Sequence, residues 1–158
     1  MIEEVCRLRV LSEISVDEVK QELRRQASNK GDTSRFYSLV DGAVWKLIEI
    51  DDNDFRRLRL ITVCMWNKLS NNTRQPIAVA ATLKAGNLAG DEVETMQEVL
   101  KISKDSERLK QPIFVREMEE DGEWLVFDGC TRCVSRALTH LQTGRVIPPL
   151  QAYFGTHL

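Results

Sequence analysis

The chain has 158 residues, 42% of them hydrophobic and 29% charged, which suffices for one globular domain that buries about two-thirds of its unfolded surface. Acidic residues outnumber basic ones, 24 to 22, so bulk positive charge does not mark a protein that coats nucleic acid. No apolar run approaches the roughly 20 residues of a membrane-spanning helix. Residues 1–5 lack the basic flank and apolar core of a signal peptide, and we expect a cytoplasmic protein with free cysteines.

The first elements expected along the chain are a helix and a hairpin. Ser15 and Glu18 are spaced as a capping box, and apolar residues then recur at helical spacing, which predicts a helix over residues 16–31 that ends near residues 29–31. Two alternating segments within residues 35–50 flank Asp41-Gly42. Because Asp-Gly favours the positive φ angles of a tight turn, this segment predicts a β-hairpin.

The middle of the chain is expected to hold a central helix and a short strand. Apolar residues recur at helical spacing over residues 53–69, with Met65 and Trp66 assigned to the core rather than to a ligand-stacking surface. The apolar run over residues 77–83 is typical of a strand. Its opening pattern, Gln-Pro-Ile-x-Val, recurs at residues 111–115.

The C-terminal part of the chain is predicted to contain two more helices and three more strands. In chain order these are a helix from residue 91, a hairpin over residues 112–127, a helix over residues 131–142 that ends at Gly144, and a strand over residues 146–154. The fold class is therefore α+β (mixed α/β) in a single domain, residues 1–158. We expect a helix/hairpin/helix part over residues 1–90 and a part that carries the functional site over residues 91–158.

The most informative segment is the elbow (residues 128–132), where a strand ends and a helix begins. Backbone N–H groups at a helix N-terminus and the helix dipole together form an anion site. Gly129 allows a tight turn, Thr131 offers a hydroxyl, and Arg132 offers a planar fork that suits phosphate. The elbow therefore predicts a nucleotide-phosphate site formed by these three residues.

A carboxylate at the same place is a candidate for catalysis. Asp128 would stand beside the phosphates, where it can bind Mg²⁺ or act as a base. Glu117 and Glu123 are expected on neighbouring strands that reach the same mouth. The alternative is that Asp128 caps the helix and Arg132 pairs with an acid such as Glu117, and the spacing leaves both interpretations open.

Two cysteines of the elbow helix suggest thiol chemistry as a further alternative. Cys130 and Cys133 form a C-x-x-C pattern where the helix dipole and Arg132 would stabilise a thiolate. Cys133 can equally point into the core as a small apolar side chain. No metal site is expected, because the remaining candidate ligands lack paired spacing: Cys6, Cys64, His140 and His157.

Clustered arginines are the candidates for nucleic-acid binding. Arg56, Arg57 and Arg59 form one basic group, and Arg136 lies on the elbow helix. A charge run is more often a solvated face than a binding site, so that alternative remains.

The motifs around the elbow resemble those of the ParB/sulfiredoxin superfamily. The similar pattern there is a helix, a "P-I-x-V" strand, a hairpin, a "G-x-x-R" elbow, a helix and a "vP" strand. This chain supplies Gln111-Pro112-Ile113-Phe114-Val115-Arg116, then Asp121-Gly122-Glu123-Trp124-Leu125-Val126-Phe127-Asp128-Gly129, then Arg132 and Val146-Ile147-Pro148. The resemblance covers residues 91–153.

The resemblance implies a nucleotide, ATP or CTP with Mg²⁺, at the elbow. Gly129 and Arg132 match both major branches of the superfamily. ParB proteins, which bind CTP and DNA, usually have "G-E-R-R" here, and this chain departs at Cys130 and Thr131. Sulfiredoxins, which are ATP-dependent reductases, have "F-G-G-C-H-R", so that Cys130 stands at their catalytic cysteine while Asp128 and Thr131 depart.

Members of the superfamily diverge in activity, and three expectations follow from the resemblance. The first is a nucleoside triphosphate-binding protein that acts on DNA or on a DNA-transfer or partition complex, with ATPase or nuclease activity assisted by Asp128. The second is a sulfiredoxin-like thiol enzyme that uses Cys130. The third is a non-catalytic interaction or inhibitor protein with a plasmid or phage partner.

Overall fold

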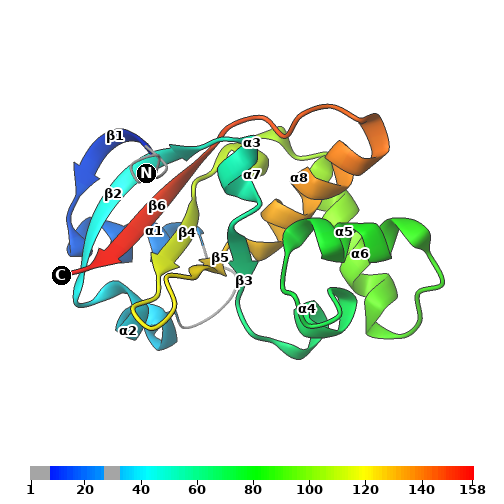
Figure 1. Cartoon of the computed structure of the whole chain (residues 1–158), viewed down its shortest axis with the longest axis horizontal. Coiled ribbons are helices and arrows are strands. Elements are labelled where there is room, and N and C mark those ends of the chain that lie inside the picture. Colours follow the sequence, from blue (N-terminus) through cyan, green and yellow to red (C-terminus); the bar gives the residue numbers. More distant parts are fainter. Residues whose placement is uncertain (1–7, 27–32) are drawn as a thin grey trace.

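A mixed six-stranded sheet runs through the part of the chain that the computed structural model describes, residues 8–26 and 33–158 (Figure 1). In spatial order the strands are β1 (Arg9–Ile14), β2 (Ala43–Ile50), β6 (Leu150–His157), β4 (Ile113–Glu117), β5 (Trp124–Asp128) and β3 (Leu58–Leu60). β4 pairs in parallel with β6 and β3 with β5, while the other neighbours are antiparallel. The expected single α+β domain is confirmed, and strands from both halves of the chain share one sheet.

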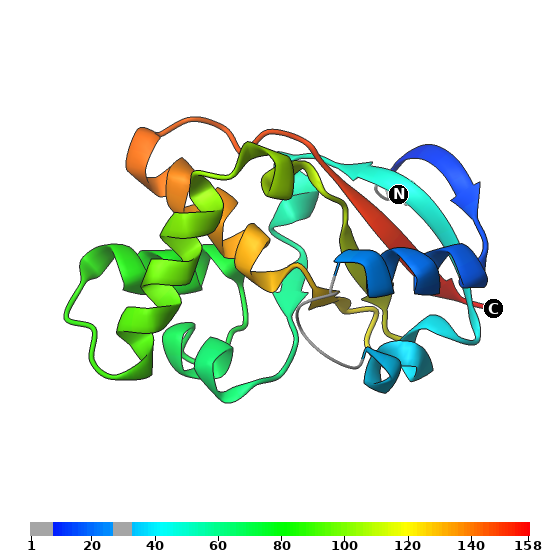
Figure 2. The ribbon, with the colours of Figure 1, turned by 180° about the vertical axis from the view of Figure 1, so that it is seen from behind.

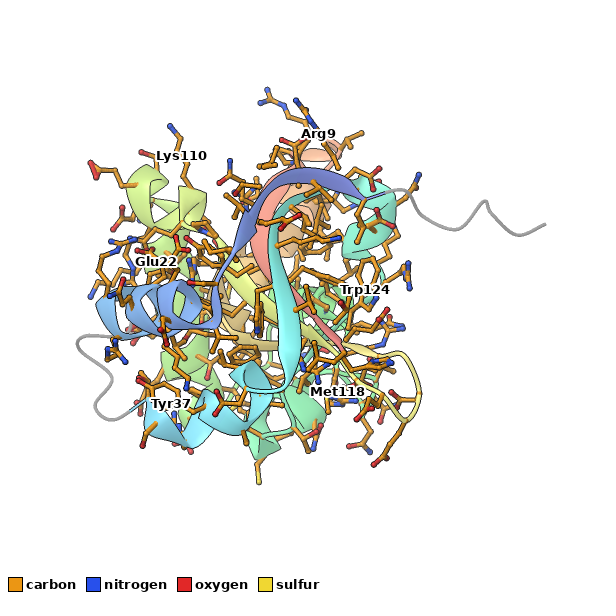
Figure 3. The ribbon with its side chains drawn as sticks, turned by 90° about the vertical axis from the view of Figure 1, so that its left-hand side faces the viewer. Arg9, Glu22, Tyr37, Lys110, Met118 and Trp124 are labelled. Atoms are coloured by element: carbon orange, nitrogen blue, oxygen red, sulfur yellow. The ribbon has the colours of Figure 1, made fainter. Side chains whose placement is uncertain are left out.

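Helices cover both faces of the sheet (Figures 1 and 2). In chain order they are α1 (Val16–Gln26), the 3₁₀ turn η1 (Ser34–Phe36), α2 (Tyr37–Val40), α3 (Asp52–Phe55), α4 (Cys64–Leu69), α5 (Pro76–Ala85), α6 (Asp91–Ser103), α7 (Ser106–Lys110) and α8 (Cys130–Thr143). Viewed from the side of β1, Glu22 of α1 and Tyr37 of α2 lie on one side of the sheet and Trp124 lies on the other (Figure 3).

Each face of the sheet has its own apolar core. On one face Val19 and Leu23 of α1 pack with Trp45, Phe114 and Phe127. On the other face Ile48 of β2, Val115 of β4 and Val126 of β5 belong to a core shared with α5, α6 and α8. Because successive side chains of a strand point to opposite faces, the two-sided burial of β4 and β5 follows from their nearly continuous apolar sequence.

Several expected elements are confirmed. The capping box forms, since Glu18 N donates to Ser15 Oγ at 3.1 Å and Ser15 N donates to Glu18 Oε1 at 3.2 Å. The hairpin of β4 and β5 and the helix α8 with its terminating Gly144 are also present. The expected end of the first helix at residues 29–31 lies outside the described residues, as does Cys6.

The expected hairpin over residues 35–50 is wrong in its first half. Residues 34–40 form η1 and α2 instead of a strand. The apolar side chains of this segment pack around Trp45 in the core: Phe36, Tyr37, Leu39 and Val40. A helical turn can bury these side chains as well as a strand can, so the apolar pattern does not separate the two. β2 pairs with β1 and β6, so its partners are remote in sequence and Asp41-Gly42 joins a helix to a strand.

The expected central helix over residues 53–69 is also wrong. The segment forms α3, β3 and α4 in turn. Asp51 caps the short α3, its Oδ1 accepting a hydrogen bond from Asp54 N at 2.8 Å. β3 then pairs in parallel with β5, which follows it by more than 60 residues, so tertiary pairing overrides the local helical spacing.

Two other boundaries differ from those expected. Residues 77–83 belong to α5 rather than to a strand, because Pro76 occupies a first-turn position and the alanine-rich run favours a helix that packs on α8. The last strand begins at Leu150 instead of residue 146. Pro148 and Pro149 cannot donate to a ladder, and β6 lies in the middle of the sheet.

Among the helices of the described residues, none combines the length and apolarity needed to cross a membrane. The cytoplasmic location stays a prediction.

Candidate functional site

The elbow has the geometry that its sequence predicts. β5 ends at Asp128, Gly129 takes the left-handed conformation at φ 96°, and α8 begins at Cys130 (Figure 2). A Cβ atom on Gly129 would lie 2.6 Å from Ile113 Cγ2 and 2.9 Å from Arg132 Nη2. Only glycine therefore fits this turn, in both conformation and space.

Arg132 has a different place from the expected one. The residue is buried, with 6% of its surface exposed, and Nη1 donates to the carbonyl oxygens of Gln111 at 2.9 Å and Pro112 at 3.2 Å. Nη2 donates to Asp128 Oδ2 at 3.3 Å. Burial lowers the pKa of Arg132, and the attraction of Asp128 acts in the opposite direction. The guanidinium thus ties the entry of β4 to the elbow, and its acidic partner is Asp128 rather than Glu117.

A cleft of about 420 Å³ lies against the first turn of α8, and we call it the elbow cleft. It is lined by residues 127–131 and by Thr33, Arg35, Phe36, Ile61, Val63 and Trp66. These residues come from η1 and its N-cap, from the segment between β3 and α4, from α4 itself, and from the end of β5 and the elbow. Of the expected site residues, Asp128, Gly129, Cys130 and Thr131 line the cleft, whereas the Arg132 side chain turns away from it.

The lining of the elbow cleft contains two kinds of groups. The N-cap residue of the 14-residue helix α8 is Gly129, which has no side chain to bind the leading N–H groups, and the positive end of the helix dipole favours an anion. Arg35 is exposed beside them, its guanidinium carbon 4.7 Å from the centre of the Phe36 ring. Trp66 and Phe36 are half-buried and supply aromatic surface. The cleft therefore combines anion-binding groups with aromatic walls.

The two cysteines of α8 occupy different environments. Cys130 lines the cleft, and its thiol donates to Val126 O at 3.3 Å. Cys133 is fully buried in the core, where desolvation raises the pKa of its thiol far above the ordinary range. Neither cysteine forms a disulfide within residues 8–26 and 33–158. Cys133 therefore packs as a small apolar residue, and a dithiol pair that faces one ligand does not form.

The other two acids expected at the site lie elsewhere. In the hairpin register, Glu117 stands opposite Trp124, whereas Asp128 stands opposite Phe114. Glu117 and Glu123 are thus at the far end of the hairpin, about 13 Å along the strands from Asp128. Glu123 there forms an ion pair with Arg74. The expectation that these acids reach the mouth of the elbow is wrong.

Arg56 and Arg57 lie between α3 and β3, and Arg59 follows within β3. Arg56 pairs with Asp52 at 3.6 Å, and the Arg57 guanidinium carbon lies 3.6 Å from the ring centre of Trp124. Arg59 Nη1 donates to the carbonyl oxygens of Arg56 and Leu58 at 2.8 and 2.9 Å. Arg56 and Arg57 remain exposed to solvent, while Arg59 is half-buried and partly committed to its own backbone.

Arg136 does not join this basic group. Its Nη2 donates to Leu109 O at 2.8 Å at the end of α7, and burial lowers the pKa of Arg136. It lines a separate hollow of about 210 Å³ together with Arg145. The expected nucleic-acid residues therefore fall on two surfaces of the described structure.

No three histidine, cysteine, aspartate or glutamate side chains gather as a potential metal site within residues 8–26 and 33–158. Mg²⁺ that accompanies a nucleotide is held mainly by phosphates, waters and one or two carboxylates. Asp128 is the cleft-lining carboxylate, and one of its oxygens accepts the hydrogen bond from Arg132.

Sequence reasoning missed half of the cleft. Arg35, Phe36 and Trp66 come from segments that were predicted as a strand or as a central core helix. Their approach to the elbow depends on η1 and on the break between β3 and α4, neither of which has a local sequence pattern. Trp66, expected in the core, packs against it with one part and lines the cleft with another.

Comparisons with known proteins give no relatives: no family model, no curated protein and no solved structure matches the chain. The resemblance to the ParB/sulfiredoxin superfamily therefore stays a prediction based on the motifs of residues 91–153.

Proposed function

We propose that this protein binds a nucleoside triphosphate in the elbow cleft. The observation that carries the proposal is the meeting of the N-terminus of α8, whose N-cap residue is a glycine, with an exposed arginine and two aromatic side chains in one cleft of about 420 Å³. Small-molecule sites commonly measure about 300–1,000 Å³. A nucleotide offers the matching chemistry, a phosphate chain at one end and a planar base at the other.

The phosphates would lie against the first turn of α8. The N–H group of Thr131 is among the four leading amides that an α-helix leaves without intrahelical partners, and Thr131 lines the cleft. Among the described residues the Thr131 hydroxyl makes no side-chain hydrogen bond, and it lines the cleft. Arg35 is the cation of this site, because Arg132 is buried behind the elbow.

The base would lie against the aromatic wall. Trp66 is half-buried in the described structure, and an indole face stacks on any base, as an aromatic side chain does in single-strand nucleic-acid sites. Phe36, Ile61 and Val63 extend the apolar surface. This part of the cleft binds by shape and stacking, and it leaves the choice between ATP and CTP to the base edge.

Asp128 and Arg132 would hold the site rather than contact the ligand. Their buried pair fixes Gly129 and the start of α8 against the entry of β4. We therefore propose binding and assign no hydrolytic step, because the carboxylate that could assist a metal accepts a hydrogen bond from Arg132. Cys130, whose thiol donates to Val126 O, serves as a wall of the cleft in this proposal.

Thermal denaturation of the reduced protein with Mg²⁺ and each common nucleoside triphosphate tests the proposal. A nucleotide present at 100 times its dissociation constant adds about 2.7 kcal/mol to the free energy of unfolding. Arg35→Gln and Trp66→Ala should reduce that gain, while Arg9→Gln, on the remote strand β1, should leave it unchanged. Cys130→Ser should keep it, which separates a nucleotide site from a thiol enzyme. If no nucleotide stabilises the wild-type protein, the proposal fails.

A second part of the proposal is action on DNA, or on a complex that handles DNA, through Arg56 and Arg57. Both side chains are exposed on one short segment beside β3, where Arg56 pairs with Asp52 and Arg57 lies on the Trp124 ring. Exposed arginines are common partners of DNA phosphates. Binding to a duplex oligonucleotide should weaken steeply as salt rises, and Arg56→Gln/Arg57→Gln should make the salt dependence shallower by about two counterions. Unchanged binding in that variant would remove DNA from the proposal without affecting the nucleotide site.

A further inference from the structure

A second hollow, of about 210 Å³, lies beside α8 beyond the elbow, and we call it the α8 hollow. Its walls include Arg136 and His140 on one side of α8, Leu109 at the end of α7, and Arg145, Val146 and Pro148 from the segment after α8. That segment doubles back over the helix end before it enters β6 (Figures 1 and 2). The α8 hollow shares no residue with the elbow cleft.

The returning segment is fixed in place, so the α8 hollow is formed before anything binds. Gly144 ends α8 in the left-handed conformation at φ 73°, and its N–H donates to His140 O at 2.8 Å. The His140 ring makes a hydrogen bond through Nδ1 with Arg145 O. Farther along, Ile147 N donates to Asp52 Oδ1 at 3.3 Å. A preformed site binds without the cost of ordering its own backbone.

The charged groups of the α8 hollow favour an anionic occupant. Arg136 is half-buried and Arg145 is exposed. Within residues 8–26 and 33–158 neither guanidinium forms an ion pair, although Arg136 donates to Leu109 O. A partly desolvated cation gains strongly from a carboxylate partner, since both oxygens of the carboxylate can accept from one guanidinium.

The remaining walls favour an apolar group next to that anion. Leu109 is half-buried, Ile147 is buried at the base, and Val146 leaves 68% of its surface exposed at the rim. A volume of about 210 Å³ is below the usual 300–1,000 Å³ of small-molecule sites and suits one large side chain. A nucleic-acid backbone would leave such a hollow unfilled, because its phosphates bind through charge and carry no apolar group.

We propose that the α8 hollow is a docking site for an acidic peptide segment of a partner protein. One aliphatic or aromatic side chain of the partner fills the hollow between Leu109 and Val146, and flanking carboxylates pair with Arg136 and Arg145. The α8 hollow is apolar and is bounded by two cations that have no acidic partner in the described structure. This combination of apolar surface and positive charge favours an acidic peptide over nucleic acid. The site is independent of nucleotide binding.

Fluorescence anisotropy with the full chain and a labelled peptide pool tests the proposal. Each probe carries one central leucine, isoleucine, phenylalanine or methionine among aspartates and glutamates. Matched probes replace the central residue by alanine, or the acids by asparagine and glutamine. At least one probe of the pool should bind, and both replacements should weaken it about tenfold or more.

Two variants of exposed residues then locate the binding without disturbing the core. Arg145→Gln removes one cation, and Val146→Glu places a repelling carboxylate at the rim. Each should weaken the bound probe about tenfold, whereas Arg9→Gln should not. The proposal is overturned if no probe binds, if Val146→Glu leaves binding unchanged, or if a DNA oligonucleotide binds through the same two residues in preference to the peptides.

Discussion

The two ends of α8 use arginine and glycine in opposite ways. At the N-terminal end Arg132 is buried, pairs with Asp128 and binds two carbonyl oxygens, and Gly129 is enclosed by Ile113. At the C-terminal end Arg145 is exposed, and a Cβ atom on Gly144 would meet nothing within 4 Å. The residue types and the left-handed turns are the same at both ends, yet the surroundings differ.

The difference teaches that residue type and spacing do not separate a structural arginine from a ligand-binding one. Arg132 stands where the elbow motif predicts a phosphate contact, and its neighbours instead use it to fasten the turn. Arg35, which no motif marks, is exposed at the cleft that the turn creates. Burial and partners decide which arginine serves the fold and which is available to a ligand.

The largest effect is expected from breaking the buried pair. Arg132→Met should lower the free energy of unfolding by about 3–5 kcal/mol, because the buried carboxylate of Asp128 loses its cationic partner. Arg145→Met, at the other end of the helix, should change it by less than about 0.5 kcal/mol. Urea denaturation measures both. The double variant Arg132→Met/Asp128→Asn should recover part of the loss, and equal losses for single and double variants would contradict the pairing.

The two glycines that flank α8 provide the next comparison. Gly129→Ala should cost about 3 kcal/mol, since the new methyl group meets both strain at φ 96° and contact with Ile113 at 2.6 Å. Gly144→Ala has the same sign of φ and open space, so it should cost about 1 kcal/mol. Chemical denaturation of the two variants separates conformational strain from crowding. Similar losses would show that the elbow is not closely packed.

Cys133 predicts how stability responds to alkaline pH. Burial raises the pKa of this thiol in the folded state, whereas the unfolded thiol titrates near its ordinary pKa of about 8.5. As pH rises, the thiol therefore loses its proton only in the unfolded state. The contribution of Cys133 to the free energy of unfolding is fully present below about pH 8.5 and falls above it, by about 2 kcal/mol at pH 10. Denaturation at pH 7 to 10 measures the decline. Cys133→Ala should make it shallower, and a parallel decline in that variant would assign it to other groups.

The smallest effect on stability is expected at Arg35. Its side chain is exposed and contacts the Phe36 ring, so Arg35→Gln should change the free energy of unfolding by less than about 0.5 kcal/mol. The same variant should weaken nucleotide binding about tenfold, because it removes the cation beside the phosphates. Calorimetric titration of folded protein measures the binding. A large loss of stability without a change in affinity would make Arg35 structural, like Arg132.

The sequence predicts the fold best where partners are local. The hairpin of β4 and β5, the elbow and α8 follow one another within residues 113–143 and are all predicted from pattern. The same Gln-Pro-Ile-x-Val pattern forms the start of α5 at residues 75–79 and of β4 at residues 111–115. The variable position is Ala78 in the first case, with more alanines after it, and Phe114 in the second. The outcome also depends on whether α8 or β6 is the neighbour.

The site was predictable to the same extent. Asp128 to Thr131 lie at the cleft as expected, because one turn places them there. Arg35 and Trp66 were missed because η1, β3 and α4 are set by packing against remote strands, and local periodicity over residues 35–40 and 53–69 favours other structures. A residue that reaches a site through tertiary contacts leaves no local pattern to find.

Backbone amide NMR of the ¹⁵N-labelled protein, titrated with Mg²⁺ and the nucleotide that stabilises it most, tests the central claim most directly. The account predicts that the largest shifts fall on the amides of Cys130 and Thr131 and on the indole N–H of Trp66, with those of β1 unchanged. It also predicts that Arg35→Gln reduces these shifts while the buried Arg132 side-chain signal stays in place. Shifts confined to another surface, or none at saturating nucleotide, would contradict the assignment of the elbow cleft as the nucleotide site.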